Sequence, residues 1–193
     1  MGRQNNFELL AGLIPPGSRV LDLGCGNGEM LAYLRDEHGC TGYGVEIDDS
    51  NVVECVKRGV DVLQLNLEDG LKIFNDNSFD VVLQINTLQN IRNLEQVLRE
   101  TARVGRQVVA SFPNFAHWPN RFSVLKGRMP VTRVLPYQWF DTPNIRVGTF
   151  KDFEILAQRN GLRVQESFGL QEGRVIRFLP NLRASLAVFL LTQ

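Results

Sequence analysis

The stretch from Val20 to Gly28, V-L-D-L-G-C-G-N-G, constrains the fold of this chain more than any other part of the sequence. The apolar run 19–23 predicts a strand buried on both faces, and apolar residues resume with helical spacing over 29–37. The glycines between them therefore form a strand-to-helix turn. Glycine reaches backbone angles that other residues avoid and lets a ligand lie against the main chain. The turn 24–28 predicts a site for a nucleotide-like ligand.

The charges around this turn indicate which nucleotide it binds. A dinucleotide fingerprint, G-x-G-x-x-G, leaves the helix N-terminus free to receive a pyrophosphate. Here the spacing is G-x-G-x-G, with Asp22 before the glycines and Glu29 after them. Carboxylates repel a pyrophosphate but suit a ligand with a sulfonium or an ammonium, which predicts S-adenosyl-L-methionine or S-adenosyl-L-homocysteine. Glu46, at the end of a predicted strand over 41–47, stands about 20 residues further on, where such folds bind a ribose diol.

Strands and helices alternate along the rest of the chain, which predicts an α/β fold with a doubly wound, mainly parallel sheet and helices on both faces. We expect a single domain over residues 1–193. The predicted helices cover 51–58, 94–104 with Asn93 as the cap, and 150–160 with Thr149 as the cap. The further predicted strands cover 61–64, 79–85, 107–112, 163–168 and 185–190, and the stretch 174–179 also has strand character.

Composition excludes several classes of protein. Lys plus Arg and Asp plus Glu number 21 each, so no global field draws the chain to nucleic acid or to a membrane. The N-terminus has no hydrophobic leader, and the apolar stretch 184–191 is too short to span a bilayer, so we expect a cytoplasmic protein. Cys25, Cys40 and Cys55 lack any C-x-x-C spacing, and we expect neither a disulfide framework nor a metal site.

In doubly wound sheets, ligands bind at the carboxyl ends of the strands, where the strand order reverses. This rule brings the glycine turn, Glu46, the loop 66–69 and the segment 84–90 around one cleft. We expect Glu46 to accept both ribose hydroxyls. The predicted cofactor contacts are Asp22, Gly24, Cys25, Gly26, Gly28, Glu46, Ile47, Asn66, Leu67 and Gln84. The residues that can orient a small polar acceptor are Asn86, Gln89, Asn114 and His117, but none is identified as catalytic.

The alternation breaks at about 113–146, an insertion that has six aromatic residues, and five basic residues against one acid. Three interpretations of this insertion remain open. Basic and aromatic residues together can bind single-stranded nucleic acid. The aromatics can instead form a cap over the cleft, which we favour over nucleic-acid binding. Aromatics and arginine also anchor protein interfaces, so the insertion can be a docking surface for another protein.

Several motifs resemble known families. V-L-D-L-G-C-G-N-G, G-V-E-I-D and D-N-S-F-D-V-V-L resemble the class I S-adenosylmethionine-dependent methyltransferases, and the resemblance implies their Rossmann-like fold with a seven-stranded sheet. S-F-P-N-F-A-H-W, G-R-M-P-V-T and L-P-Y-Q-W-F-D-T-P-N-I are more specific and resemble the MetW family of methionine biosynthesis proteins, with the likeness running from about 16 to 161. By position, the superfamily cofactor motif matches Asp22, Gly24, Gly26, Gly28 and Glu46, whereas Asn66 stands where many members have an aspartate.

The resemblance to the MetW family implies an association with homoserine O-acyltransferase, which transfers an acetyl or succinyl group. Two hypotheses follow. In the first, the protein binds S-adenosylmethionine and modulates the acyltransferase without transferring a methyl group. In the second, it is an S-adenosylmethionine-dependent methyltransferase acting on a small molecule. We favour the first, because the family-specific motifs lie in the insertion and not at a recognisable catalytic group. The segment 84–90, Q-I-N-T-L-Q-N, also lacks the Asn/Asp-Pro-Pro-aromatic motif of amino methyltransferases.

Overall fold

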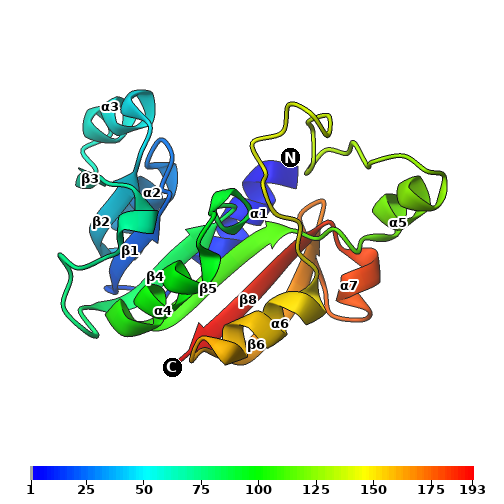
Figure 1. Ribbon diagram of the computed structural model, residues 1–193. Helices are drawn as coiled ribbons and strands as arrows, with labels where there is room; N and C mark the ends of the chain where they lie inside the picture. The colour runs from blue at the N-terminus through cyan, green and yellow to red at the C-terminus, as the bar shows by residue number, and fades with distance from the viewer. Residues whose placement is uncertain (1) are drawn as a thin grey trace.

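A computed structural model describes residues 2–193, and side chains from residue 6 onward, so residue 1 of the expected domain lies outside the described residues. Eight strands form one sheet in it. The strands are β1 Arg19–Leu23, β2 Thr41–Glu46, β3 Val62–Gln64, β4 Phe79–Ile85, β5 Gly105–Pro113, β6 Arg163–Gln171, β7 Arg174–Ile176 and β8 Leu186–Thr192. Their order is β3-β2-β1-β4-β5-β8-β6-β7. Neighbours from β3 to β5 are parallel, whereas β8, β6 and β7 are joined by antiparallel pairings (Figure 1).

The helices cover both faces of this sheet. They are α1 Gly2–Ala11, α2 Glu29–His38, α3 Asp49–Lys57, α4 Leu94–Val104, α5 Trp118–Leu125, α6 Phe150–Arg159 and α7 Pro180–Arg183, with the 3-10 turns η1 Leu67–Asp69 and η2 Leu88–Asn90. Residues of α4 and α6 pack with one side of the sheet in one core cluster, and residues of α1, α2 and α3 pack with the other side in a second cluster. Figure 1 shows α4 and α6 lying in front of the strands. None of the described helices has the length and apolar character needed to cross a membrane.

The parallel strands explain where the site lies. The strand order reverses between β1 and β4, which are direct neighbours through pairs such as Asp22 and Leu83. Because β1, β2 and β4 run in the same direction, their carboxyl ends meet at one edge of the sheet, as expected for a ligand site of a doubly wound fold. The buried residues Val20 and Leu21 belong to opposite core clusters, which is why the first strand is apolar on both faces.

The resemblance to class I methyltransferases implied a seven-stranded sheet, and the structure has eight strands, with β7 in the stretch of strand character at 174–179. β7 forms a hairpin with β6 through Glu172 and Gly173, which both have positive φ. The predicted strand over 174–179 is therefore shorter, and the chain continues into α7. Asn93 stands at the N-cap position of α4, but its side chain makes no capping hydrogen bond, and its amide donates to the side chain of Gln96 at 2.6 Å. Thr149 does cap α6, where it accepts from the backbone N–H of Asp152.

Residues 115–148, which we call the arch, leave the carboxyl end of β5 and return at the start of α6 (Figure 1). Both ends of the arch are joined, because the backbone N–H of Phe115 donates to the carbonyl of Gly148 at 2.9 Å. Asn114 lies under this junction and is fully buried, and its side-chain amide donates to the carbonyls of Asn181 and Ala184 at 3.0 and 2.8 Å. The base of the arch is thus fixed to the body of the protein.

Candidate functional site

The glycine turn adopts the backbone that its sequence predicts. Gly24, Gly26 and Gly28 have φ angles of 76°, 54° and 74°, in the left-handed region that favours glycine. A Cβ on Gly24 would come within 2.7 Å of the Thr87 side chain, whereas a Cβ on Gly26 would meet nothing within 4 Å. Gly24 therefore allows close packing against the chain after β4, and the space above Gly26 is open for a ligand.

Glu46 links the end of β2 to the glycine turn. Its side chain is buried, and its Oε2 accepts a hydrogen bond from the backbone N–H of Gly26 at 2.8 Å. Its Oε1 accepts from the N–H groups of Ile47 and Asp48 at 2.8 and 3.0 Å. A carboxylate has about four acceptor positions, so about one is left. Binding of both hydroxyls of a ribose at Glu46 thus requires the exchange of at least one of these backbone bonds.

Asp22 gives the site a second buried carboxyl group, at the end of β1. Only 3% of the residue is exposed, and no hydrogen bond to its carboxyl group is found within the described part of the chain. Burial, together with the nearby charge of Glu46, raises the pKa of Asp22 to about 7. A buried carboxylate without a partner is costly, and a cation beside it removes part of that cost. The site is therefore suited to a positively charged group.

A cavity of about 470 Å³ lies beside these residues, and we call it the glycine-turn cleft. Of the predicted contacts, it is lined by Gly24, Glu46, Ile47, Asn66 and Leu67. Its other lining residues are Val45, Asn51, Leu65, Glu68, Asn86, Thr87, Asn90, Ile91 and Arg92. The sequence interpretation missed Asn51, Ile91 and Arg92. Asn51 lies in the first turn of a predicted helix, which gave no signal of a ligand contact. Of the predicted contacts, Asn66 already uses its side-chain oxygen to accept a hydrogen bond from the N–H of Glu68.

The remaining predicted contacts do not line this cleft. Gln84 is fully buried, and its amide donates to the hydroxyl of Thr101 in α4 at 2.9 Å, so its side chain turns away from the cleft edge. The sulfur of Cys25 lies 3.8 Å from that of Cys55. Burial raises the pKa of the Cys25 thiol far above its usual range, which does not suit a nucleophile. Asp22, Gly26 and Gly28 belong to the turn itself and its preceding strand.

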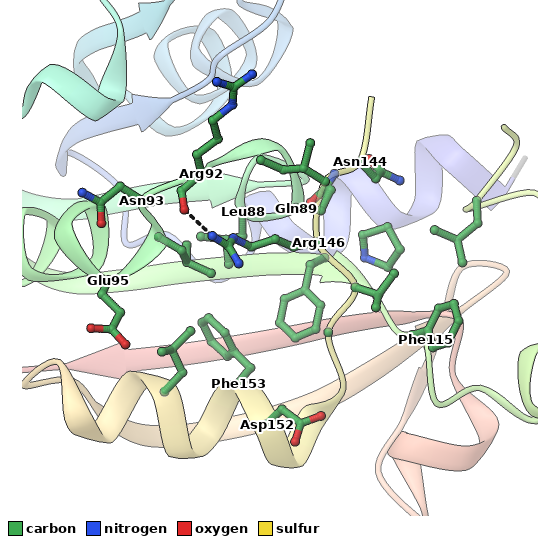
Figure 2. A pocket seen from close by; sticks show the side chains of 18 residues that line it. Leu88, Gln89, Arg92, Asn93, Glu95, Phe115, Asn144, Arg146, Asp152 and Phe153 are labelled. Carbon is green, nitrogen blue, oxygen red and sulfur yellow. Dashed lines mark hydrogen bonds between the residues drawn. The ribbon is translucent and has the colours of Figure 1, made fainter. Parts of the chain in front are cut away.

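A second cavity of about 540 Å³ lies on the other side of η2, and we call it the arch cavity (Figure 2). Its walls come from the end of β5, the N-terminal parts of α4 and α6, and the last residues of the arch, 144–148, which we call the strap. The apolar part of the lining includes Leu88, Leu94, Phe112, Phe153 and Leu156, and the charged part comprises Arg92, Glu95, Arg146 and Asp152. Arg92 lines both cavities.

The strap is held against the wall between the two cavities. The backbone N–H groups of Ile145 and Arg146 both donate to the carbonyl of Gln89 at 3.0 Å. The Arg146 guanidinium donates to the carbonyl of Ile91 at 2.9 Å and also to the carbonyl of Arg92, the contact drawn in Figure 2. The end of the arch is therefore attached to the same short turn that forms one side of the glycine-turn cleft.

The residues considered for orienting an acceptor are separated in space. Asn86 lines the glycine-turn cleft, and Gln89 lines the arch cavity. Asn114 uses its side chain to fix the base of the arch and lines neither cavity. His117 lines neither cavity, is 7% exposed, and has its pKa lowered by burial. Among the described residues, no group of three or more His, Cys, Asp or Glu side chains is arranged to hold a metal ion.

Comparisons with known proteins identify the family of this chain. A family model described as methionine biosynthesis protein MetW matches residues 4–191. The chain is 40% identical over 195 residues to the bifunctional methionine biosynthesis protein MetXA/MetW of Rhodopirellula baltica, an alignment that covers 94% of this chain and 31% of that protein. The chain thus spans about a third of the length of this curated relative.

Solved structures show the same fold at low identity. A SAM-dependent methyltransferase from Thermotoga maritima has a TM-score of 0.72 and 19% identity, with 98% of this chain and 87% of that chain covered. An S-adenosylmethionine-dependent methyltransferase from Mesorhizobium loti has a TM-score of 0.72 and 15% identity, with 98% of both chains covered. The predicted fold class, the Rossmann-like class I methyltransferase type, is confirmed, with eight strands in place of the predicted seven.

Proposed function

The chain belongs to the MetW family of methionine biosynthesis proteins, and from this premise we propose that it binds S-adenosylmethionine and associates with homoserine O-acyltransferase, whose activity it modulates. The observation that carries the association is the Rhodopirellula baltica relative, whose name joins MetXA and MetW in one bifunctional protein. Parts that are joined in one bifunctional protein commonly act together. MetXA is, on this proposal, the acyltransferase part of that relative.

The residues of the glycine turn, of the strand before it and of the cleft beside it fit S-adenosylmethionine. Open space above Gly26 leaves room for the ligand against the main chain. Asp22 is a buried carboxyl group without a hydrogen bond in the described part of the chain, and its carboxylate form would be stabilised by the ligand's cationic end. Glu46 would accept from the ribose hydroxyls, and Ile47 and Leu67 would contact the adenine. When bound, S-adenosylmethionine supplies an activated methyl group on a sulfonium.

A regulatory role is favoured because the described residues provide no obvious catalytic group at the cleft. His117 is buried outside both cavities, and Asn114 is used at the base of the arch. The buried Cys25 thiol has a strongly raised pKa. S-Adenosylmethionine is made from methionine, so a protein that binds it and contacts an enzyme early in methionine synthesis can report the supply of product to that enzyme.

The alternative function is methyl transfer to a small molecule, and the arch cavity is the observation that favours it. Its volume of about 540 Å³ lies in the range of about 300–1,000 Å³ that is typical of small-molecule sites. It has an apolar part and a charged rim, and only η2 and the residues after it separate it from the glycine-turn cleft. An acceptor in this cavity would need a path past that turn to reach a methyl group.

One experiment separates the two functions. The protein is captured from native lysate with its bound partners, and the recovered material is incubated with S-adenosylmethionine carrying a radiolabelled methyl group. We expect homoserine O-acyltransferase to co-purify, its activity to change with S-adenosylmethionine, and no metabolite to become labelled. A labelled small molecule would favour the methyltransferase. If the captured protein is recovered without the acyltransferase, although both proteins are present above micromolar concentration, the result would argue against the association.

A further inference from the structure

The arch exposes an unusual amount of apolar surface for a segment with a fixed base. Between residues 118 and 147, the exposed large apolar side chains are Trp118, Phe122, Val124, Leu125, Met129, Val131, Tyr137, Trp139, Phe140, Ile145 and Val147. Trp139 and Phe140 are 72% and 70% exposed, and their rings pack edge to face at 5.7 Å. A concentration of exposed apolar side chains in one segment is typical of interaction sites.

The helix α5 shows most clearly that this surface lacks a partner within the chain. Trp118, Phe122 and Leu125 stand at spacings of four and three, which puts them on one side of the helix. A surface helix of a globular protein normally turns such a side toward the core. Here all three are exposed, Leu125 to 83%, whereas the buried residue of α5 is Asn120, whose amide donates to the carbonyl of Asn114 at 3.1 Å.

The aromatic side chains of the arch are not arranged as a cap over the glycine-turn cleft. None of the aromatic residues of the arch lines that cleft. Leu135, Phe115 and the strap line the arch cavity, but Trp118, Trp139 and Phe140 line neither cavity. Figure 1 shows α5 extending past the carboxyl end of β5, away from the edge formed by β1 and β2. The aromatics that a cap would bury are thus turned to solvent.

The charge of the arch indicates what kind of surface it meets. The arch has five basic residues, Arg121, Lys126, Arg128, Arg133 and Arg146, against the single acid Asp141. Lys126, Arg128 and Arg133 form no ion pair in the described part of the chain. A symmetric dimer through the arch would bring this positive charge against itself. A different protein with an apolar patch and surrounding carboxylates fits better.

We infer that the exposed apolar face of the arch is the surface that docks homoserine O-acyltransferase. The inference rests on the proposed function for the identity of its occupant, and on the arch for its location. The fused relative places both proteins in one chain, which keeps such an interface at high effective concentration. On the acyltransferase, the matching surface would present apolar pockets for the aromatic side chains and carboxylates for the arginines.

The test measures binding of the intact protein to the immobilised homoserine O-acyltransferase of the same organism by surface plasmon resonance. The first double variant combines Trp139→Ala with Phe140→Ala, and the second combines Phe122→Ala with Leu125→Ala. We expect at least one of them to raise the dissociation constant by about 30-fold or more, as the loss of interface anchors does. Arg128→Glu with Arg133→Glu should slow association and weaken its dependence on salt.

The matched control is Ile73→Ala, because Ile73 is 60% exposed and lies between η1 and β4, away from the arch. It should change the dissociation constant by less than about twofold. Thermal melts and S-adenosylmethionine titrations of every variant should match the intact protein. If the intact protein does not bind the acyltransferase, the proposed function and this inference both fail. If it binds and both double variants bind equally well, or if they instead dissociate a dimer of this chain, only this inference fails.

Discussion

The guanidinium of Arg146 donates a hydrogen bond to the backbone carbonyl of Ile91 at 2.9 Å, which ties the returning end of the arch to a wall of the glycine-turn cleft. Ile91 follows η2, and the same stretch of chain contributes Thr87 and Asn90 to the cleft. A ligand that shifts this stretch will therefore shift the strap, and through it the arch. The cleft and the proposed docking surface share one physical connection.

This connection predicts that binding of S-adenosylmethionine and binding of the acyltransferase affect one another. Saturating S-adenosylmethionine should change the affinity for the acyltransferase, by about 5-fold to 150-fold for typical coupling energies. Arg146→Ala removes the side-chain bonds of the strap but keeps its backbone bonds to Gln89, so it should lower this ratio, while each ligand alone still binds. Arg159→Ala is the control, because it removes an arginine that lies in the last turn of α6, outside the arch and the strap. An undiminished ratio in Arg146→Ala would rule out the Arg146 side chain as the connection.

Glu46 should be the main determinant of cofactor affinity. Glu46→Ala removes the acceptor for the ribose hydroxyls and the bond to the Gly26 N–H. A hydrogen bond to a charged group contributes about 1.5–3 kcal/mol, so we expect the dissociation constant for S-adenosylmethionine to rise about 10-fold to 100-fold. Calorimetric titration measures it, with Glu54→Ala on the exposed side of α3 as the control. Equal affinity for Glu46→Ala and the control would refute the assignment.

The raised pKa of Asp22 predicts how cofactor binding depends on pH. The carboxyl group titrates at about 7, and only its ionised form attracts a cationic ligand. Affinity for S-adenosylmethionine should therefore fall as the pH drops below about 7, by up to about tenfold per pH unit. Asp22→Asn should bind weakly with little dependence on pH between 6 and 8. The measurement is a series of titrations across this range, and parallel pH profiles for both proteins would contradict the prediction.

Much of the glycine-turn cleft could be predicted because its signals are local. The turn 24–28 needs positive φ angles at fixed spacing, and Glu46 ends a short strand that the sequence delimits. Gln84, a predicted contact, does not line the cleft, and strand alternation carried the signal for its orientation. Side chains two residues apart share a face, so Gln84 lies on the side of Val82, which packs in the cluster of α4 and α6.

The arch cavity could not be predicted, because its walls come from Leu88, Phe112, the strap and α6, which are far apart in the sequence. The orientation of α5 also could not be predicted from the sequence. The spacing of Trp118, Phe122 and Leu125 is that of a buried helix face, and only the polar anchors at Asn114 and Asn120 turn it outward. Local pattern indicates that a side is apolar, but tertiary contacts decide whether the chain itself covers it.

The sheet beneath the site makes a separate prediction about stability. Gly42 in β2 has φ of 149°, and a Cβ there would lie 1.7 Å from the backbone carbonyl oxygen of Val20 in β1. Because β1 and β2 are paired along their lengths, neither backbone can move aside without breaking the ladder. Gly42→Ala should therefore lower the free energy of unfolding by more than about 4 kcal/mol, or prevent folding.

Gly39→Ala is the matched control for Gly42→Ala. Gly39 also has positive φ, at 63°, and it ends α2 in the left-handed conformation, but a Cβ there would meet nothing within 4 Å. Its substitution should therefore cost only the backbone term, about 1 kcal/mol. Urea denaturation of both variants measures the difference. If Gly42→Ala were as stable as Gly39→Ala, the close approach of β1 and β2, the strands that contain Asp22 and Glu46, would be wrong.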